Sequence, residues 1–161
     1  MATENLYVGD GSTTLYSFTF PYINTSDIYV SIGGTDLTIT TEYTFANETT
    51  IQLVTAPTSG AAIRIYRQTS NTDLRAVFFP GSAIRASDLN DNFAQSLYVT
   101  QEADAESLSA TTTANTAKTT ADTALTNSSA AVTTANSTIA TANTANTNAS
   151  AAVTTANAAS A

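Results

Sequence analysis

Residues 121–142 read ADTALTNSSAAVTTANSTIATA, and their spacing decides what the second half of this chain can form. Alanine dominates a series of positions that steps alternately by four and three residues from position 110 to position 159, and 13 of these 15 positions are Ala. A heptad series of this kind places one face of a helix against other helices. The sequence therefore predicts a long helix that associates as a coiled coil.

Large apolar residues define one side of this predicted helix. Leu125, Val132 and Ile139 lie seven residues apart, the next step falls on Asn146, and the following one falls on Val153. Each of these large apolar residues lies one residue after a position of the alanine series, so together they widen the apolar face of the helix. We predict a parallel homotrimer whose seam consists of Ala121, Ala124, Leu125, Val132, Ala135, Ile139, Ala142, Ala149, Val153 and Ala156.

The composition of residues 109–161 leaves two alternatives open. Ala, Thr, Asn and Ser occupy 18, 16, 7 and 6 of these 53 positions, and so little apolar bulk is also typical of a disordered linker. A heptad period does not by itself separate two strands from three. Threonine disfavours an isolated helix by about 0.5–0.7 kcal/mol per position relative to Ala, so this helix must gain stability by association.

The first half of the chain has the pattern of a small β domain. Between residues 6 and 68, apolar and polar side chains alternate with period two, and Gly, Pro, Asn, Asp and Ser interrupt them at short intervals. Gly33-Gly34 between two alternating runs predicts a β-hairpin. Strands are expected near Leu6–Val8, Leu15–Phe20, Ile28–Ile32, Leu37–Ile39, Tyr43–Phe45, Ile51–Leu53 and Ile63–Arg67. The fold class is therefore β + α, a small antiparallel β-sandwich or barrel with inward-facing aromatic residues, followed by a long helix that forms a trimeric coiled coil.

The domain organisation has three parts. A β-rich domain spans residues 1–86, an amphipathic connecting helix spans 87–108, and the Ala/Thr-rich stalk spans 109–161. Leu89, Phe93 and Leu97 form an apolar stripe on the connecting helix, but this stripe does not continue in register with the alanine series. We therefore expect a bend, a stutter or a local break near residues 99–110.

The composition excludes several classes of function. The chain has no Cys and no His, so thiol and imidazole nucleophiles and Cys/His zinc sites are absent. A net charge of -8 argues against nucleic acid or an anionic membrane as the partner. No apolar stretch approaches the roughly 20 residues of a membrane-spanning helix. No motif indicates a catalytic, cofactor or metal site, so we expect neither enzyme activity nor a cofactor.

A set of short motifs carries a family resemblance. They are Tyr7 with Asp10-Gly11-Ser12, Phe18–Tyr22, Thr41–Ala46, Thr49–Leu53, Arg67 with Thr69-Ser70, Thr72-Asp73, Phe79, Gly81-Ser82, Ile84–Ala86 and Asp88–Asn90. In this order they resemble the N-terminal virion-attachment domain of tail fibres from short-tailed bacteriophages (podoviruses). The resemblance covers about residues 1–106, and the alanine-rich stalk matches such fibres only in kind.

The resemblance implies a structural virion protein of the phage tail. Its N-terminal domains, residues 1–86, would anchor a homotrimeric fibre between adaptor and nozzle proteins, and a distal region or a separate receptor-binding protein would bind the host. By position, the residues expected at the tail interface are Arg67, Asp73, Arg85, Asp88 and Asn90. Arg85 and Asp88 lie three residues apart at a helix start, so an ion pair between them is the alternative to tail contact.

Two other functions fit parts of the sequence. A trimeric surface adhesin stalk with a β head would share the coiled coil but should carry an export signal. A carbohydrate-binding β module on a linker would need aromatic residues exposed on one face. The alanine series stops in mid-repeat at residue 161. We therefore expect a piece of a longer fibre or, failing that, a short fibre that leaves receptor binding to another protein.

Overall fold

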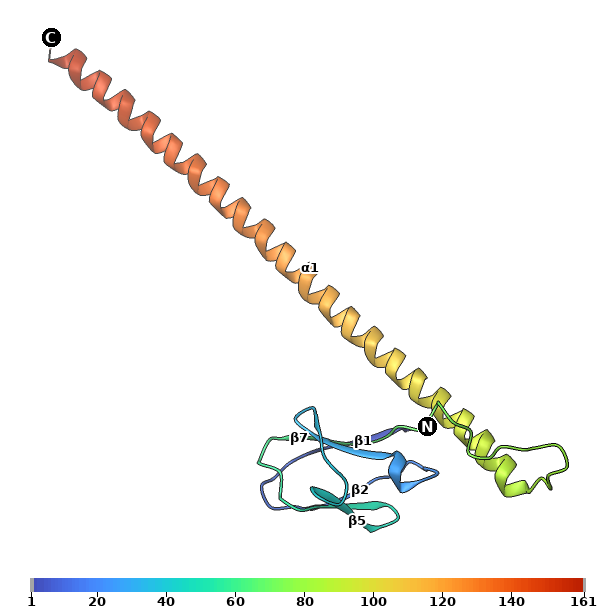
Figure 1. Cartoon of the computed structure of the whole chain (residues 1–161). Helices are drawn as coiled ribbons and strands as arrows, with labels where there is room; N and C mark the ends of the chain where they lie inside the picture. The colour runs from blue at the N-terminus through green and yellow to red at the C-terminus, as the bar shows by residue number, and fades with distance from the viewer. Residues whose placement is uncertain (1, 161) are drawn as a thin grey trace. The chain divides into compact units, whose positions relative to one another are not determined.

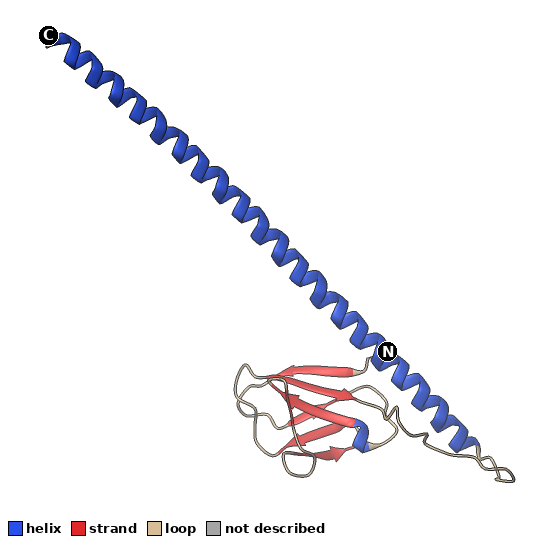
Figure 2. Cartoon of the chain, turned by 45° about the horizontal axis from the view of Figure 1, so that its top comes forward, coloured by secondary structure: helices blue, strands red, loops and turns tan. Residues whose placement is uncertain are grey.

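The computed structural model describes residues 2–160, and its first part is a set of short strands (Figure 1). The elements are β1 (Glu4–Val8), β2 (Leu15–Ser17), the 3-10 helix η1 (Thr25–Asp27), β3 (Ile28–Ile32), β4 (Thr35–Asp36), β5 (Tyr43–Asn47), β6 (Thr50–Leu53) and β7 (Ala62–Arg67). They form two antiparallel sheets, β1-β7-β3-β4 and β2-β6-β5, which Figure 2 shows in red. The predicted antiparallel β domain followed by a helix is confirmed.

The inner faces of both sheets share one hydrophobic core. On β7, Ile63 and Ile65 point inward and pair with Ile32 and Val30 of β3, as period-two alternation requires. Phe18 is buried as predicted, although β2 already ends at Ser17. The buried core consists of Tyr16, Phe18, Phe20, Ile28, Val30, Tyr43, Ile51, Leu53, Ile63 and Ile65.

The outer face of the larger sheet carries two aromatic residues that are only partly buried. The rings of Tyr29 and Tyr66 stack with centroids 5.6 Å apart, and Cζ of Arg64 lies 4.0 Å from the centroid of the Tyr66 ring. The Tyr66 hydroxyl donates to Oδ1 of Asp36 at 2.9 Å. Burial, and then this hydrogen bond, raise the pKa of Tyr66 to about 12. The prediction of inward-facing aromatic residues is therefore wrong for this pair, because the two rings stack on each other across β3 and β7.

The predicted hairpin forms at Gly33 and Gly34. Both glycines have positive φ, 60° and 85°, which an L side chain rarely adopts, and Ile32 pairs with Thr35 across the turn. The second strand is shorter than expected, because β4 ends at Asp36 instead of reaching Ile39. The chain leaves the sheet there and turns through Thr40, which has a φ of 70°.

The second part of the chain is a single helix, α1 (Ala86–Ala159). Its hydrogen-bonded backbone is uninterrupted, so of the bend, stutter or local break expected near residues 99–110 the local break is absent. The physical reason is that residues 86–159 contain no Gly and no Pro. The apolar stripe of residues 89–97 gives way to the alanine series within a continuous helix. Thr and Ser hydroxyls along the helix donate to the carbonyl four residues earlier, as Thr116 does to Thr112 at 3.0 Å.

The chain divides into two compact units, Met1–Ser109 and Ala110–Ala161. The first turns of α1 thus belong with the β-sheets, and the expected boundary at 108/109 lies one residue before this division. Every residue from 103 to 160 is exposed. Within residues 2–160, no helix combines the length and the apolar character needed to cross a membrane. Association of α1 with further copies remains a prediction.

Candidate functional site

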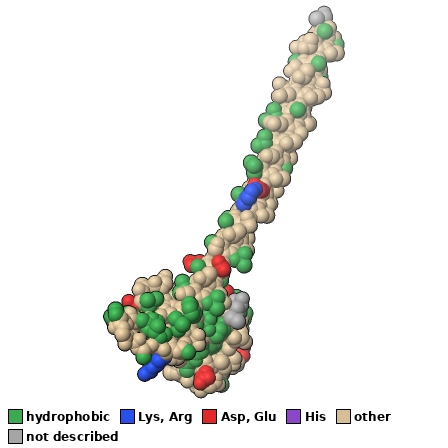
Figure 3. Space-filling view, turned by 90° about the vertical axis from the view of Figure 1, so that its right-hand side faces the viewer, with side chains coloured by type: hydrophobic (Ala, Val, Ile, Leu, Met, Phe, Trp, Pro, Cys, Tyr) green, Lys and Arg blue, Asp and Glu red, His purple; other side chains and the backbone are tan. Residues whose placement is uncertain are grey.

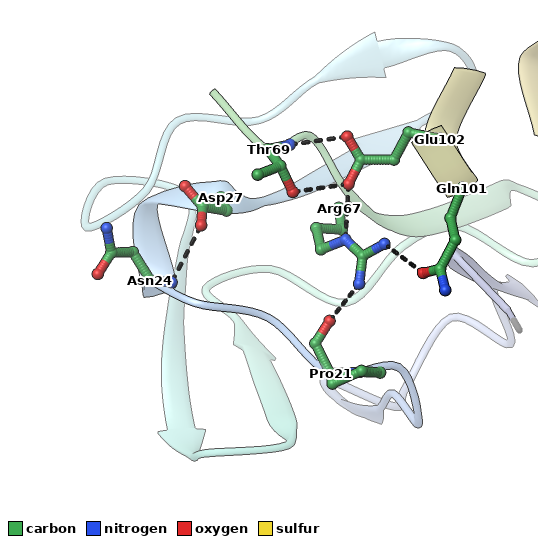
Figure 4. Close-up of polar contacts among 7 residues, drawn as sticks. All are labelled: Pro21, Asn24, Asp27, Arg67, Thr69, Gln101 and Glu102. Carbon is green, nitrogen blue, oxygen red and sulfur yellow. Dashed lines mark hydrogen bonds and ion pairs between the residues drawn. The ribbon is translucent and has the colours of Figure 1, made fainter. Parts of the chain in front are cut away.

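A buried arginine joins the β-sheets to α1 (Figure 4). The side chain of Arg67, the last residue of β7, is 0% exposed. Its Nε donates to Oε1 of Glu102 at 2.6 Å, its Nη1 to the carbonyl oxygen of Pro21 at 2.6 Å, and its Nη2 to Oε1 of Gln101 at 3.1 Å. The guanidinium carbon lies 3.8 Å from the centroid of the Tyr98 ring. We call Arg67 and these partners the Arg67 clamp.

Glu102 is the hub of the clamp on the helix side. In addition to the bond from Arg67, its Oε2 accepts from the backbone N–H of Thr69 and its Oε1 from the Thr69 hydroxyl, both at 2.8 Å. The carboxylate is 18% exposed. Three charge-assisted bonds on one carboxylate therefore hold the end of β7, and the residues that follow it, against α1.

Two amide side chains of α1 hold the loop that follows β7, residues 68–85. Asn92 forms a pair of bonds with the backbone of Ala76: its Oδ1 accepts from the N–H and its Nδ2 donates to the carbonyl, both at 2.9 Å. Gln95 is 5% exposed. Its loop partners are the carbonyls of Ser70 and Asp73, at 2.6 Å each, and the N–H of Arg75 at 3.0 Å. The loop is irregular, but side chains of α1 bind several of its backbone N–H and carbonyl groups.

The side of α1 that meets the rest of its unit is thus polar. Asn92, Gln95, Tyr98 and Glu102 recur at helical spacing and supply these contacts. The apolar stripe of the same turns faces outward, since Leu89, Phe93 and Leu97 are 40%, 64% and 55% exposed. This orientation reverses the usual one, in which a helix buries its apolar side against its own domain.

Further apolar side chains of the loop are also exposed, and Figure 3 shows a broad group of hydrophobic side chains on one face of the first unit. We define the 74–97 surface by its exposed apolar members, Leu74, Val77, Phe79, Ile84, Leu89, Phe93 and Leu97. Phe79 lies at a turn in which its carbonyl accepts from the N–H of Ser82, with Gly81 at a φ of 87°. Exposed apolar side chains that gather on one surface are typical of a site that binds another molecule.

The structure places the five predicted interface residues in two regions. Arg67 is buried in the clamp, whereas Arg85 directly precedes α1 and Asp88 and Asn90 lie in its first turns. Fourteen residues of helix separate Asp88 from Glu102, which is about 20 Å at 1.5 Å per residue. Asp73 lies between the two regions, in the loop, with its backbone carbonyl on Gln95.

Arg85 differs from the other arginines of residues 2–160 because its guanidinium makes no ion pair or hydrogen bond to another side chain. Arg64 pairs with Glu4, Arg67 with Glu102, and Arg75 donates to Asn24. Within the described chain Arg85 forms no ion pair, so the alternative of a bond to Asp88 is not realised; Asp88 instead accepts from Ser87 at 3.4 Å. The guanidinium of Arg85 is therefore exposed and makes no ion pair within residues 2–160.

Sequence reasoning missed the side chains of α1 that hold Arg67 and the 68–85 loop. In the sequence, Glu102 is one of several acidic residues between positions 88 and 106, and Asn92 and Gln95 carry no signal as single residues. Their common spacing, with Tyr98, on one side of α1 was available in the sequence. No group of three or more His, Cys, Asp or Glu that could hold a metal ion occurs among residues 2–160.

A comparison with known families decides the affiliation of this chain. Residues 1–127 match the family described as "Phage T7 tail fibre protein, N-terminal domain". The chain belongs to this family. The tail fiber protein of Escherichia phage T7 is 40% identical over 103 residues, which are 60% of this chain and 19% of that protein. That of Enterobacteria phage T3 is 38% identical over 103 residues, 60% of this chain and 18% of its own length.

The chain is also similar to a phage protein with a different name. The "Depolymerase 1, capsule K8-specific" of Klebsiella phage K5-4 is 31% identical over 94 residues, 56% of this chain and 13% of that protein. The chain thus spans less than a fifth of the length of the curated relatives it matches. As a tail fibre protein it is a structural component of the virion tail.

Proposed function

We propose that this chain anchors a homotrimeric tail fibre to the phage tail and connects it to a distal host-binding region. The observation that carries the proposal is the orientation of α1. Its polar side contacts the rest of its own unit, and Leu89, Phe93 and Leu97 remain exposed. A structural protein that must bind a neighbour in the virion needs such a surface. Attachment to the tail is what the family name and the tail fibre relatives support.

The 74–97 surface is the proposed contact with the tail adaptor and nozzle proteins. Its apolar side chains supply contact area, and Arg85 supplies a planar donor that suits a carboxylate or a pair of carbonyls on the partner. Asp73, Asp88 and Asn90 complete the polar rim. Arg67 has no exposed surface in its side chain, so its proposed role is to hold this region against the β-sheets through the clamp.

The second unit is the proposed stalk. Leu125, Val132, Ile139 and Val153 are 57–68% exposed on a helix of poor intrinsic propensity, and association would bury them. A parallel homotrimer with the predicted seam accounts for the heptad spacing. The distal host-binding function would lie beyond this stalk or on a separate receptor-binding protein, because the relatives are more than five times as long as the segment they share with the chain.

The test is binding of the purified chain to tail adaptor and nozzle proteins, measured as Kd at fixed salt. Arg85→Gln should weaken binding at least tenfold, about 1.4 kcal/mol. Arg64→Gln is the matched control, because Arg64 is also an exposed arginine, 49% in its side chain, but lies on β7 away from the 74–97 surface. Equal affinities for wild type and both variants would refute the proposed role of Arg85, and no binding by wild type would refute the anchoring function.

A further inference from the structure

Asn146 interrupts the one row of large apolar residues on the second unit. Leu125, Val132, Ile139 and Val153 are exposed by 68%, 57%, 58% and 60%, and Asn146 occupies the seven-residue step between Ile139 and Val153. Residues seven apart lie almost above one another on a helix. The amide of Asn146 is therefore the polar member of an otherwise apolar row.

The chemistry of this row fits further copies of the same chain better than an unlike partner. An apolar partner would leave the Asn146 amide without a hydrogen bond, whereas another Asn146 can both donate to it and accept from it. Copies would also not repel one another, because Lys118 and Asp122 are the charged residues of this unit and already pair within the helix at 2.6 Å. The 3.5-residue period is that of helices that supercoil around like helices.

The rest of the stalk does not specify how copies align along their length. Ala, Thr, Asn and Ser make up nearly all of residues 109–161, and Ala recurs every heptad, so a shift by seven residues would place Ala on Ala again. It would also place Leu125 on Val132 and Val132 on Ile139, which are equally apolar. Asn146 makes such a shift unfavourable, because the shift would bury its amide against Ile139 or Val153.

We propose that the Asn146 side chains of three copies meet in one layer and set the in-register, parallel alignment of the stalk. This inference rests on the proposed homotrimer and adds the residue that determines its register. Ala156 follows Val153 by three residues on the same seam, so in this alignment the three copies of Ala156 also share a layer. Hydrogen bonds within the Asn146 layer satisfy the amides only when all copies are aligned.

The experiment compares Asn146→Val with Asn148→Val in the full chain. Asn148 is two residues further, roughly 200° around the helix, and so points away from the seam. Both variants also carry Ala156→Cys, as does the reference protein, and because the chain has no other Cys this thiol reports alignment alone. Oligomer mass is measured by sedimentation at micromolar concentration, thermal stability by circular dichroism, and alignment by the yield of disulfide under mild oxidation.

The expected result is specific to Asn146. The reference protein and Asn148→Val sediment as trimers and form the disulfide in high yield. Asn146→Val remains oligomeric and melts at a higher temperature, because a buried amide has become a methyl pair, but its disulfide yield falls at least twofold as shifted alignments appear. An unchanged yield, or identical melting of the two variants, overturns the role of Asn146 and leaves the trimer standing. A monomeric reference protein overturns both.

Discussion

Replacing Glu102 with Gln should separate the two halves of the Arg67 clamp with almost no change of shape. The carboxylate is 18% exposed and accepts from Arg67 at 2.6 Å and from two donors of Thr69 at 2.8 Å. A Gln amide offers one acceptor oxygen, and its NH₂ group would face a donor. The substitution therefore leaves the fully buried Arg67 guanidinium with no compensating charge.

The expected loss follows from the burial of that charge. Removing one partner of a buried ion pair costs about 3–5 kcal/mol of the free energy of unfolding. Glu102→Gln should fall at the lower end, about 3 kcal/mol, because Arg67 keeps its bonds to Pro21 and Gln101. With a urea dependence of about 2 kcal/mol/M, the midpoint of unfolding should drop by about 1.5 M.

Tyrosine fluorescence during urea unfolding is a suitable assay. The chain has no Trp, and its seven Tyr lie between residues 7 and 98, so the signal reports on the first unit without the stalk. Glu106→Gln is the control, since Glu106 is exposed on the same helix and forms no ion pair within residues 2–160. It should change stability by less than about 0.5 kcal/mol.

The clamp reasoning fails if Glu102→Gln and Glu106→Gln unfold at the same urea concentration. A double-mutant cycle sharpens the test, because Arg67→Met with Glu102→Leu removes both charges together. The double variant should be more stable than the sum of the single changes predicts, by about 2 kcal/mol. Additive losses would show that the two side chains contribute independently of each other.

Two further predictions concern the turn between β1 and β2. Hydrogen bonds to the charged Asp10 carboxylate, first from the Thr13 hydroxyl and then from backbone N–H groups, hold the pKa of Asp10 well below its usual range. Because the pKa of Asp10 is lower in the folded state, its hydrogen bonds contribute fully to folding stability above about pH 4, and this stability is lost as the pH falls. Asp10→Asn should therefore flatten the acid side of a plot of melting temperature against pH. Parallel curves for wild type and variant would contradict this prediction. Gly9→Ala should cost about 1–3 kcal/mol in urea unfolding, because an added Cβ would lie 2.5 Å from the carbonyl oxygen of Thr58. Wild-type stability of that variant would show that the backbone there moves aside freely.

Much of the β domain could be predicted because its signals are local. Alternation on β3 and β7 places Val30, Ile63 and Ile65 in the core, and the two glycines of the hairpin require a turn with positive φ. The outward stack of Tyr29 and Tyr66 could not be predicted from composition, since an aromatic residue alone does not tell which face of a sheet it occupies. The sequence left a bend, a stutter and a local break open across residues 99–110, because a change of apolar stripe does not by itself tell whether the helix backbone is interrupted.

By itself, the sequence determined the antiparallel β domain and the heptad row that includes Asn146 and favoured a long helix over a disordered linker, because period two, period 3.5 and the absence of Gly and Pro act between near neighbours. Only the tertiary structure decided which side of α1 meets the sheets. The bonds from Arg67 and Thr69 to Glu102 join residues 33 to 35 apart along the chain. A buried guanidinium must find acceptors on every side, and the polar side of α1 provides them, which turns Leu89, Phe93 and Leu97 outward.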